Sequence, residues 1–250
     1  MSKMNTVIAE VRRSGGLALK AFAAFLLRPT LEVRQTQAIS AKAMALWLLA
    51  FSFAATAIFA LLALPLIFDT NAAPGEGLRA VFDQPAISVI LAVVILGPLV
   101  EEVIFRGWLT GTMRAFAGSA LFLAIWFGGS WLLTRHLSQL TGPAPMVALA
   151  AAGLFAFVAV NRNGRQNHAG WYRSVFPLVF WAQGLLFGGL HFTNISSTSP
   201  ILPLILTAPL VICGWLWGYA RINLGFGPAW MLHMAYNLPP AMAAMAFGAG

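Results

Sequence analysis

Residues 97–107 read GPLVEEVIFRG, and this stretch lies within a long apolar run over residues 86–110. Two adjacent carboxylates, Glu101 and Glu102, and the guanidinium of Arg106 interrupt a segment that is otherwise uncharged. A charged side chain at the centre of a bilayer costs at least about 2.5 kcal/mol. Because folding does not require that cost, the stretch indicates a functional site on an apolar helix.

The rest of the chain has no comparable acids. The whole chain holds seven aspartates and glutamates, and the five besides Glu101 and Glu102 lie in polar or loop-like segments that precede this stretch. They are Glu10, Glu32, Asp69, Glu76 and Asp83. Chemistry that needs a carboxylate inside the apolar body must therefore use Glu101 or Glu102.

The composition decides the fold class. The chain is 60% hydrophobic and 9% charged, whereas soluble domains have about a quarter of their residues charged. Apolar runs close to the length of a membrane span recur along it. They cover residues 44–68, 86–110, 119–134, 145–160, 174–192, 201–220 and 228–247. We therefore predict an all-α, polytopic transmembrane helical bundle of about seven spans.

The charge distribution predicts orientation and domains. The net charge of +8 is concentrated in residues 1–43 and in short loops, a pattern that indicates cytoplasmic segments rather than a nucleic-acid partner. Residues 1–43 form either a basic amphipathic helix on the cytoplasmic leaflet or a solvated arm. Residues 44–250 form the transmembrane domain, with the acidic segment 69–85 outside. We expect a multi-pass protein of a bacterial inner membrane with a cytoplasmic N-terminus.

Helix geometry distinguishes the two acids. Residues four apart share a face, whereas adjacent residues point about 100° apart. Glu102 is therefore expected to pair with Arg106, and Glu101 to be the general base that activates water. In the alternative interpretation, both acids merely form ion pairs with Arg106 and a loop arginine.

Two histidines also lie in apolar runs. His191 follows Phe187 by four residues, and His233 precedes Asn237 by four, so that imidazole and amide share a face. Glu101, His191 and His233 could bind a divalent metal such as zinc and leave a position open. Equally, the set could position a water and an oxyanion without a metal. His136 and His168 lie in connecting segments and are expected at the membrane interface.

Signals of other hydrolases are missing from the sequence. It contains no His-Glu-x-x-His zinc helix and no Gly-x-Ser-x-Gly turn. The predicted spans contain no aspartate pair. Zincin, serine and aspartyl mechanisms therefore fit poorly.

Three motifs in order, Glu101-Glu102-x-x-x-Arg106, Phe187-x-x-x-His191 and His233-x-x-x-Asn237, resemble those of the CAAX-protease and bacteriocin-processing (CPBP, or Abi) family. The resemblance covers about residues 86–245 and implies an intramembrane endopeptidase acting on a membrane-associated protein or peptide. It also implies roles for these residues. Glu101 would activate the water, His191 would position it, His233 and Asn237 would stabilise the oxyanion, and Glu102, Arg106 and Phe187 would support the site.

The chain departs from the family pattern between its first two motifs. A hairpin over residues 119–160 and the basic loop 161–173 are inserted there. We expect this insertion, about 119–173, to reshape the substrate entrance or to provide a docking surface for a membrane-complex partner.

Simple spans also create a difficulty of depth. They place His191 and His233 toward opposite membrane faces, so a shared site requires a broken helix or a re-entrant segment over residues 193–200. Otherwise the predicted span boundaries are wrong.

Two other functions are compatible with the sequence. A catalytically silent family member would act as a scaffold, assembly factor or subunit of a membrane complex, with Trp126, Trp131, Trp181, Trp215 and Trp217 on its binding faces. A transporter would use the two acids as a proton relay, but internal repeats and further intramembrane acids are missing.

Overall fold

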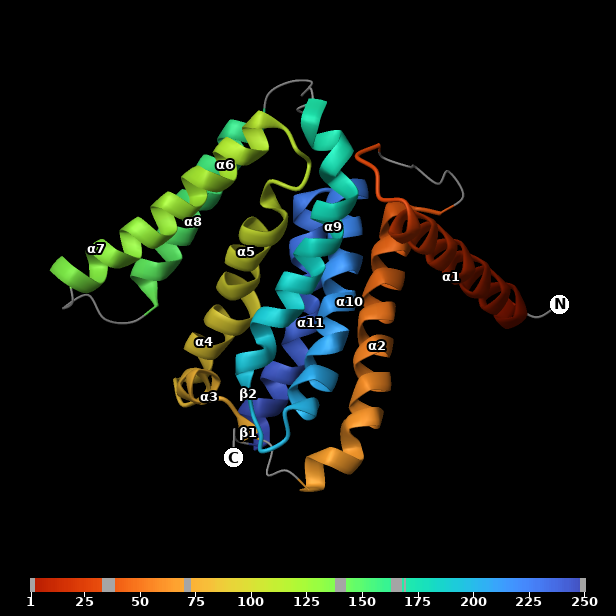
Figure 1. Cartoon of the computed structure of the whole chain (residues 1–250), viewed down its shortest axis with the longest axis horizontal. Coiled ribbons are helices and arrows are strands. Elements are labelled where there is room, and N and C mark those ends of the chain that lie inside the picture. The colour runs from red at the N-terminus through yellow and green to blue at the C-terminus, as the bar shows by residue number, and fades with distance from the viewer. Residues whose placement is uncertain are drawn as a thin grey trace. The chain divides into compact units, whose positions relative to one another are not determined.

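The computed structural model describes residues 3–32, 39–69, 73–137, 143–162, 168 and 170–247, and it is dominated by helices (Figure 1). The chain forms two compact units. Unit 1 comprises residues 1–71, 176–192 and 197–232, and unit 2 comprises residues 72–175, 193–196 and 233–250.

Six helices of the described residues are long and apolar enough to cross a membrane, which confirms the predicted all-α, multi-pass architecture. They cover residues 41–67, 86–107, 113–136, 144–161, 170–194 and 201–223. The seventh apolar run, 228–247, forms α11 (Phe226–Phe247), which is of similar length but carries His233, Asn237 and two internal prolines. These polar and helix-breaking residues explain why α11 is not among the six.

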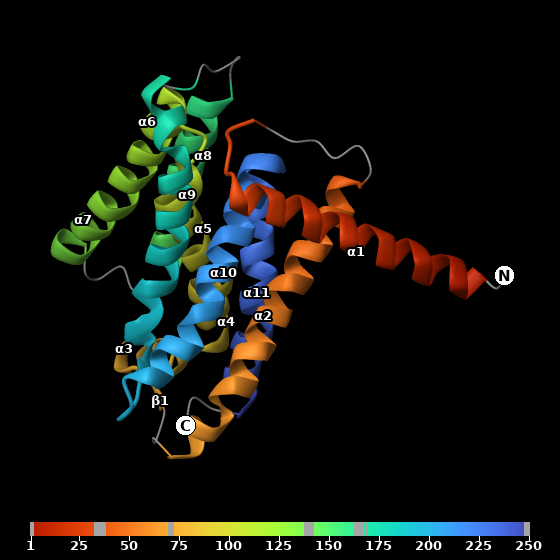
Figure 2. The same cartoon turned by 45° about the vertical axis from the view of Figure 1, so that its right-hand side comes forward.

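Unit 1 is built around α2 (Ala41–Asp69) and α10 (Ile201–Asn223), which pack side by side (Figures 1 and 2). The indole nitrogen of Trp217 donates to the hydroxyl of Ser52 at 3.2 Å, and both side chains are fully buried. Trp217 is therefore a core residue, so its assignment to a binding face is wrong.

The N-terminal segment forms α1 (Lys3–Leu27), which packs against α2 and α10. Phe25 is buried and its ring contacts those of Phe180 and Tyr219, with centroids 5.0 and 5.1 Å apart. Arg12, Arg13 and Lys20 are exposed. The helix is thus basic on one side and packed on the other. Residues 1–2 and 33–38 of the predicted 1–43 arm lie outside the described residues.

Glycines allow α9 (Gly170–Leu190) and α10 to approach closely. A Cβ on Gly188 would lie 2.7 Å from the backbone nitrogen of Val211, and one on Gly214 would lie 2.8 Å from the Cα of Gly184. Gly107 and Gly111 are also four residues apart, but Gly107 ends a helix whereas Gly111 lies in a turn with φ of +68°. Gly111 is therefore a turn glycine, with a positive φ that favours glycine.

Unit 2 contains the helical segment that carries the two acids, together with a hairpin. The segment consists of α4 (Ala86–Val89), η1 (Ile90–Leu96), α5 (Gly97–Glu102) and η2 (Val103–Gly107). The hairpin pairs α6 (Met113–Leu123), η3 (Ala124–Gly128) and α7 (Gly129–His136) with α8 (Ala144–Asn161), and α6 and α8 lie side by side (Figures 1 and 2). Of the predicted 119–173 insertion, residues 138–142, 163–167 and 169 lie outside the described residues.

Short elements complete unit 2. They are β1 (Ala73–Pro74), α3 (Glu76–Phe82), η4 (His191–Asn194, which spans both units) and β2 (Ile195–Ser196). The strands β1 and β2 pair antiparallel, with Ala73 opposite Ser196. Residues 193–196 thus form a turn and a strand, so this part of the segment expected to be re-entrant pairs with residues 73–74.

The turn after the first motif is closely held. Tyr172 donates its hydroxyl to the carbonyl of Leu109 at 3.2 Å, and His168 Nδ1 lies 2.7 Å from the carbonyl oxygen of Thr110. Thr112 caps α6, because its hydroxyl accepts from the backbone N–H of Ala115 at 3.1 Å. These bonds fix the exit of the chain from the helix that carries Glu101 and Glu102.

Candidate active site

The helix that carries the acids contains two wide turns. In η1 and η2, hydrogen bonds run from an N–H to the carbonyl five residues earlier, and α5 lies between them. Such π-turns are rare and are frequent at functional sites. A Cβ on Gly97 would lie 2.6 Å from the carbonyl oxygen of Ala92, so glycine permits the tight approach that closes the first wide turn.

Glu102 and Arg106 form a buried ion pair across one helical turn, as their spacing predicts. Both side chains are fully buried. Removing a buried charge from water is costly, and a partner in close contact offsets much of that cost. Glu102 therefore stabilises the buried guanidinium of Arg106 within unit 2.

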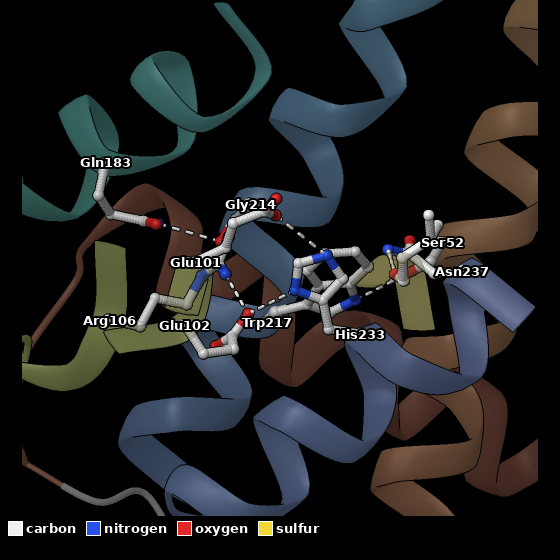
Figure 3. A network of polar contacts seen from close by, with 10 residues as sticks. Ser52, Glu101, Glu102, Arg106, Gln183, Gly214, Trp217, His233 and Asn237 are labelled. Carbon is white, nitrogen blue, oxygen red and sulfur yellow. Dashed lines mark hydrogen bonds and ion pairs between the residues drawn. The ribbon is translucent and has the colours of Figure 1, made fainter. Parts of the chain in front are cut away.

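His233, from α11, lies between the two carboxylates (Figure 3). Its Nδ1 lies 3.1 Å from Oε1 of Glu102, and its Nε2 lies 3.4 Å from Oε2 of Glu101. A carboxylate without a proton only accepts hydrogen bonds. A neutral imidazole can therefore donate to one acid, and bonding both requires a second proton, on the ring or on a carboxyl group.

The two acids differ in access. The Glu101 side chain is 31% exposed, whereas Glu102 is fully buried and His233 is 2% exposed. Of the two carboxylates, Glu101 is therefore the one that a water or a peptide can reach. This difference follows the face separation that the sequence predicts for adjacent helical residues.

Asn237 contacts the same helix at a different level. Its Nδ2 donates to the backbone carbonyl of Val93, in η1, at 3.0 Å. His233 and Asn237 thus use one face of α11, as their spacing predicts, to contact α5 and η1 respectively. An amide NH₂ carries two hydrogens, and this bond uses one of them.

Phe187 and His191 belong to unit 1. Their rings lie 4.8 Å apart, and the ring of Phe187 also contacts that of Trp217 with centroids 5.6 Å apart. His191 Nδ1 lies 2.7 Å from the carbonyl oxygen of Phe187. Because a carbonyl only accepts, Nδ1 carries a hydrogen, and Nε2 is the acceptor nitrogen of the neutral ring.

The structure thus brings together four predicted site residues, Glu101, Glu102, Arg106 and His233, with Asn237 one turn farther along α11. Phe187 and His191 are placed together in the other unit. The predicted approach of His191 to Glu101 would join the two units, and it stays a prediction.

A metal at this site would need ligands with the right chemistry. Glu101 and His233 offer an oxygen and a nitrogen that face one another, which are ligand types used by zinc. Among the described residues, however, no group of three or more His, Cys, Asp or Glu side chains is placed to hold a metal ion. The residues grouped in this structure therefore supply fewer protein ligands than the three typical of a catalytic zinc site.

Sequence reasoning did not identify Val93 and Gly97 as part of the site's framework. The available signal was the Gly97-Pro98 pair, which indicates an interrupted helix. That pair cannot by itself indicate that the Asn237 side chain would donate a hydrogen bond to the Val93 carbonyl.

Comparison with known proteins identifies the family. The family model of the type II CAAX prenyl endopeptidase Rce1-like proteins matches residues 83–166 and 165–239. These two segments include all three motifs. Comparisons with curated proteins and with solved structures each found no match. The match covers well over half of the chain, and the chain therefore belongs to the Rce1-like family of type II CAAX prenyl endopeptidases, within the CPBP group that the motifs resemble.

Proposed function

We propose that this protein is an intramembrane endopeptidase in which Glu101 activates water to hydrolyse a peptide bond of a membrane-associated protein or peptide. Family membership supports endopeptidase activity in general. The observation that carries the finer proposal is the position of Glu101, a partly exposed side chain whose Oε2 lies 3.4 Å from His233 Nε2, beside a buried Glu102–Arg106 pair.

The proposed reaction needs one proton carrier. The Glu101 carboxylate removes a proton from a water molecule while the water oxygen forms a bond to the carbonyl carbon of the scissile peptide. The carbonyl oxygen becomes an oxyanion. When the C–N bond breaks, the proton held by Glu101 passes to the leaving nitrogen, which yields a new carboxyl terminus and a new amino terminus.

Glu102 is assigned a supporting role. Its carboxylate is inaccessible and is already engaged by Arg106 and by Nδ1 of His233. Through His233 it orients the Nε2 atom toward Glu101 and toward the space that a substrate carbonyl would use. Charge developing there is stabilised best by donors held in place beforehand.

The remaining motif residues complete the proposal. His233 Nε2 and the second amide hydrogen of Asn237 would donate to the oxyanion, as the family resemblance implies. His191 would accept a hydrogen bond from the attacking water through Nε2, because its Nδ1 is bound to the Phe187 carbonyl.

The substrate class follows from the family and the membrane setting. A prenylated peptide that ends in a CAAX sequence is the first substrate to test, since the family is described by that activity. We further propose that the N-terminus is cytoplasmic, on the evidence of the basic arm and loops, and that the membrane is a bacterial inner membrane.

Cleavage assays test this function. Purified protein in lipid nanodiscs would be incubated with a farnesylated CAAX peptide, and in parallel the new amino termini in cell membranes would be compared with and without the protein. Wild type is expected to generate new termini by one route or the other. Glu101→Ala and His191→Ala should abolish them, and Leu190→Ala, a matched change at an exposed neighbour of His191, should not.

The result that would refute the proposal is equally specific. Cleavage retained by both the Glu101 and the His191 variants would exclude the mechanism. New termini found by neither route with a folded wild type would instead favour the alternative function, a catalytically silent scaffold, assembly factor or subunit of a membrane complex.

One surface would serve that alternative. The predicted docking surface within residues 119–173 carries large exposed apolar side chains, including Trp131 at 58% and Phe155 at 77% exposure. Stable copurification of a membrane protein that is lost in Phe155→Ala, and is insensitive to Glu101→Gln, would support a silent member.

A further inference from the structure

The wide turn before the two acids leaves one backbone carbonyl in need of a donor. In an α-helix the carbonyl of Val93 would accept from the N–H of Gly97. Here the Gly97 N–H instead donates to Ala92, five residues earlier. If each N–H continued to donate to the carbonyl five residues earlier, the Val93 carbonyl would accept from the N–H of residue 98. Residue 98 is proline, which has none.

Asn237 supplies the missing donor. Its Nδ2 lies 3.0 Å from the Val93 carbonyl oxygen. A carbonyl deprived of its helical partner is costly to bury, and within a membrane it must be satisfied by the protein. The half-buried Asn237 side chain therefore restores a hydrogen bond that Pro98 removes.

The same face of α11 thus contacts the helical segment 86–107 at two positions. Asn237 binds η1 before the proline, and His233 contacts Glu101 and Glu102 after it. Asn237 and His233 are four positions apart on α11. The hydrogen bond from Asn237 to Val93 therefore fixes the position of α11 along the interrupted helix. Small displacements of a catalytic group lower rates steeply, by about 100-fold for 1 Å.

We propose that Asn237 is a positioning residue, which by bonding the Val93 carbonyl at the Pro98 break sets His233 against Glu101 and Glu102. This rests on the proposed function for its kinetic consequence. Its structural consequence, an energetic coupling between Asn237 and Pro98, holds whether or not the protein is a protease. The role differs from that of an oxyanion donor, which acts on the substrate and is indifferent to the residue at position 98.

A double-mutant cycle tests the proposal. Asn237→Ala would be made in the native background and in two backgrounds that restore an N–H at position 98, Pro98→Ala and Pro98→Val. The valine background keeps more of the buried side-chain volume, so that one background remains if the other fails to fold. Pro65→Ala, at an exposed proline inside α2, is the matched control.

Unfolding midpoints of the folded variants, read without any substrate, give the first measurement. The decrease in unfolding midpoint caused by Asn237→Ala should be at least halved when residue 98 can donate a hydrogen bond to the Val93 carbonyl. The decrease should stay the same when Pro65 is replaced. An equal loss in all backgrounds would overturn the proposal, even for an inactive protein.

Cleavage kinetics give the second measurement where activity is present. In the native background we expect Asn237→Ala to lower kcat by about tenfold or more with little change in KM. In either Pro98 background, the factor by which Asn237→Ala lowers kcat should be at least three times smaller than in the native background. If Asn237→Ala lowers kcat by the same factor in every background, Asn237 acts on the oxyanion alone, and this result would contradict its positioning role.

Discussion

Glu101 and Glu102 are adjacent in sequence but occupy different surroundings. Glu102 is fully buried against Arg106, whereas Glu101 is about one-third exposed and faces Nε2 of His233. This contrast is the basis for giving Glu101 the chemical role and Glu102 the supporting one. It also makes separate predictions for the two acids.

Arg106 should be essential for folding as the partner of Glu102. Arg106→Met would remove the guanidinium that offsets the buried Glu102 charge and leave His233 as its neighbour, and we expect it to lower the free energy of unfolding by about 3–5 kcal/mol. Adding Glu102→Gln to the same chain should recover much of that loss, because the buried charge is removed.

Denaturation of the purified protein in mixed micelles measures both variants. Arg114→Met, at an exposed arginine, is the control and should change stability by no more than about 0.5 kcal/mol. Equal losses at positions 106 and 114 would contradict a structural role for the ion pair.

At the scale of elements, the packing of α9 on α10 depends on glycine at specific positions. Gly188 faces the backbone of Val211, whereas a Cβ on the adjacent Gly189 would meet nothing within 4 Å. Gly188→Ala should therefore destabilise the protein by about 1–3 kcal/mol through overpacking. Gly189→Ala should be neutral or stabilising by up to about 1 kcal/mol, because alanine favours a helix more than glycine does.

The same denaturation assay distinguishes these neighbours directly. A loss at Gly189 equal to that at Gly188 would mean that helix propensity, rather than the close approach of α10, decides the effect.

Capping of α6 gives another prediction at this scale. Thr112→Ala removes the acceptor for the Ala115 N–H and should lower the free energy of unfolding by about 1 kcal/mol. Thr112→Ser keeps the hydroxyl and should restore most of it. A serine variant as unstable as the alanine variant would argue that the threonine methyl group, and not the cap, matters.

Much of the fold and part of the site could be predicted from sequence, for physical reasons. Apolar runs of bilayer length determine the helices, and an i,i+4 spacing determines the Glu102–Arg106 pair. The contact of His233 with Glu102 joins residues 131 apart in sequence, and local periodicity carries no information about it. Likewise, the donor that bonds the Val93 carbonyl beside Gly97-Pro98 comes from Asn237, 144 residues away in sequence.

At the scale of the whole molecule, the charge pattern predicts which segments face the cytoplasm. Cys213 is the chain's single cysteine, so Cys213→Ala provides a cysteine-free background for labelling. In it, Gly16→Cys in α1 and Gly77→Cys in α3 place thiols at exposed positions where a Cβ meets nothing within 4 Å. We expect Gly77→Cys to react with a membrane-impermeant maleimide in intact bacterial spheroplasts, and Gly16→Cys to react only after permeabilisation.

Labelling of Gly16→Cys from outside would reverse the predicted orientation. Labelling of both positions from the same side would contradict a crossing of the membrane by α2 between them.

The central claim is that Glu101 is the base that activates water, and the kcat of Glu101→Gln tests it most directly. Glutamine keeps the size and shape of the side chain but cannot accept the proton of water. On a peptide that wild type cleaves, kcat should fall by at least about 100-fold while the unfolding midpoint stays unchanged. A folded Glu101→Gln protein whose kcat stays within threefold of wild type would contradict the claim.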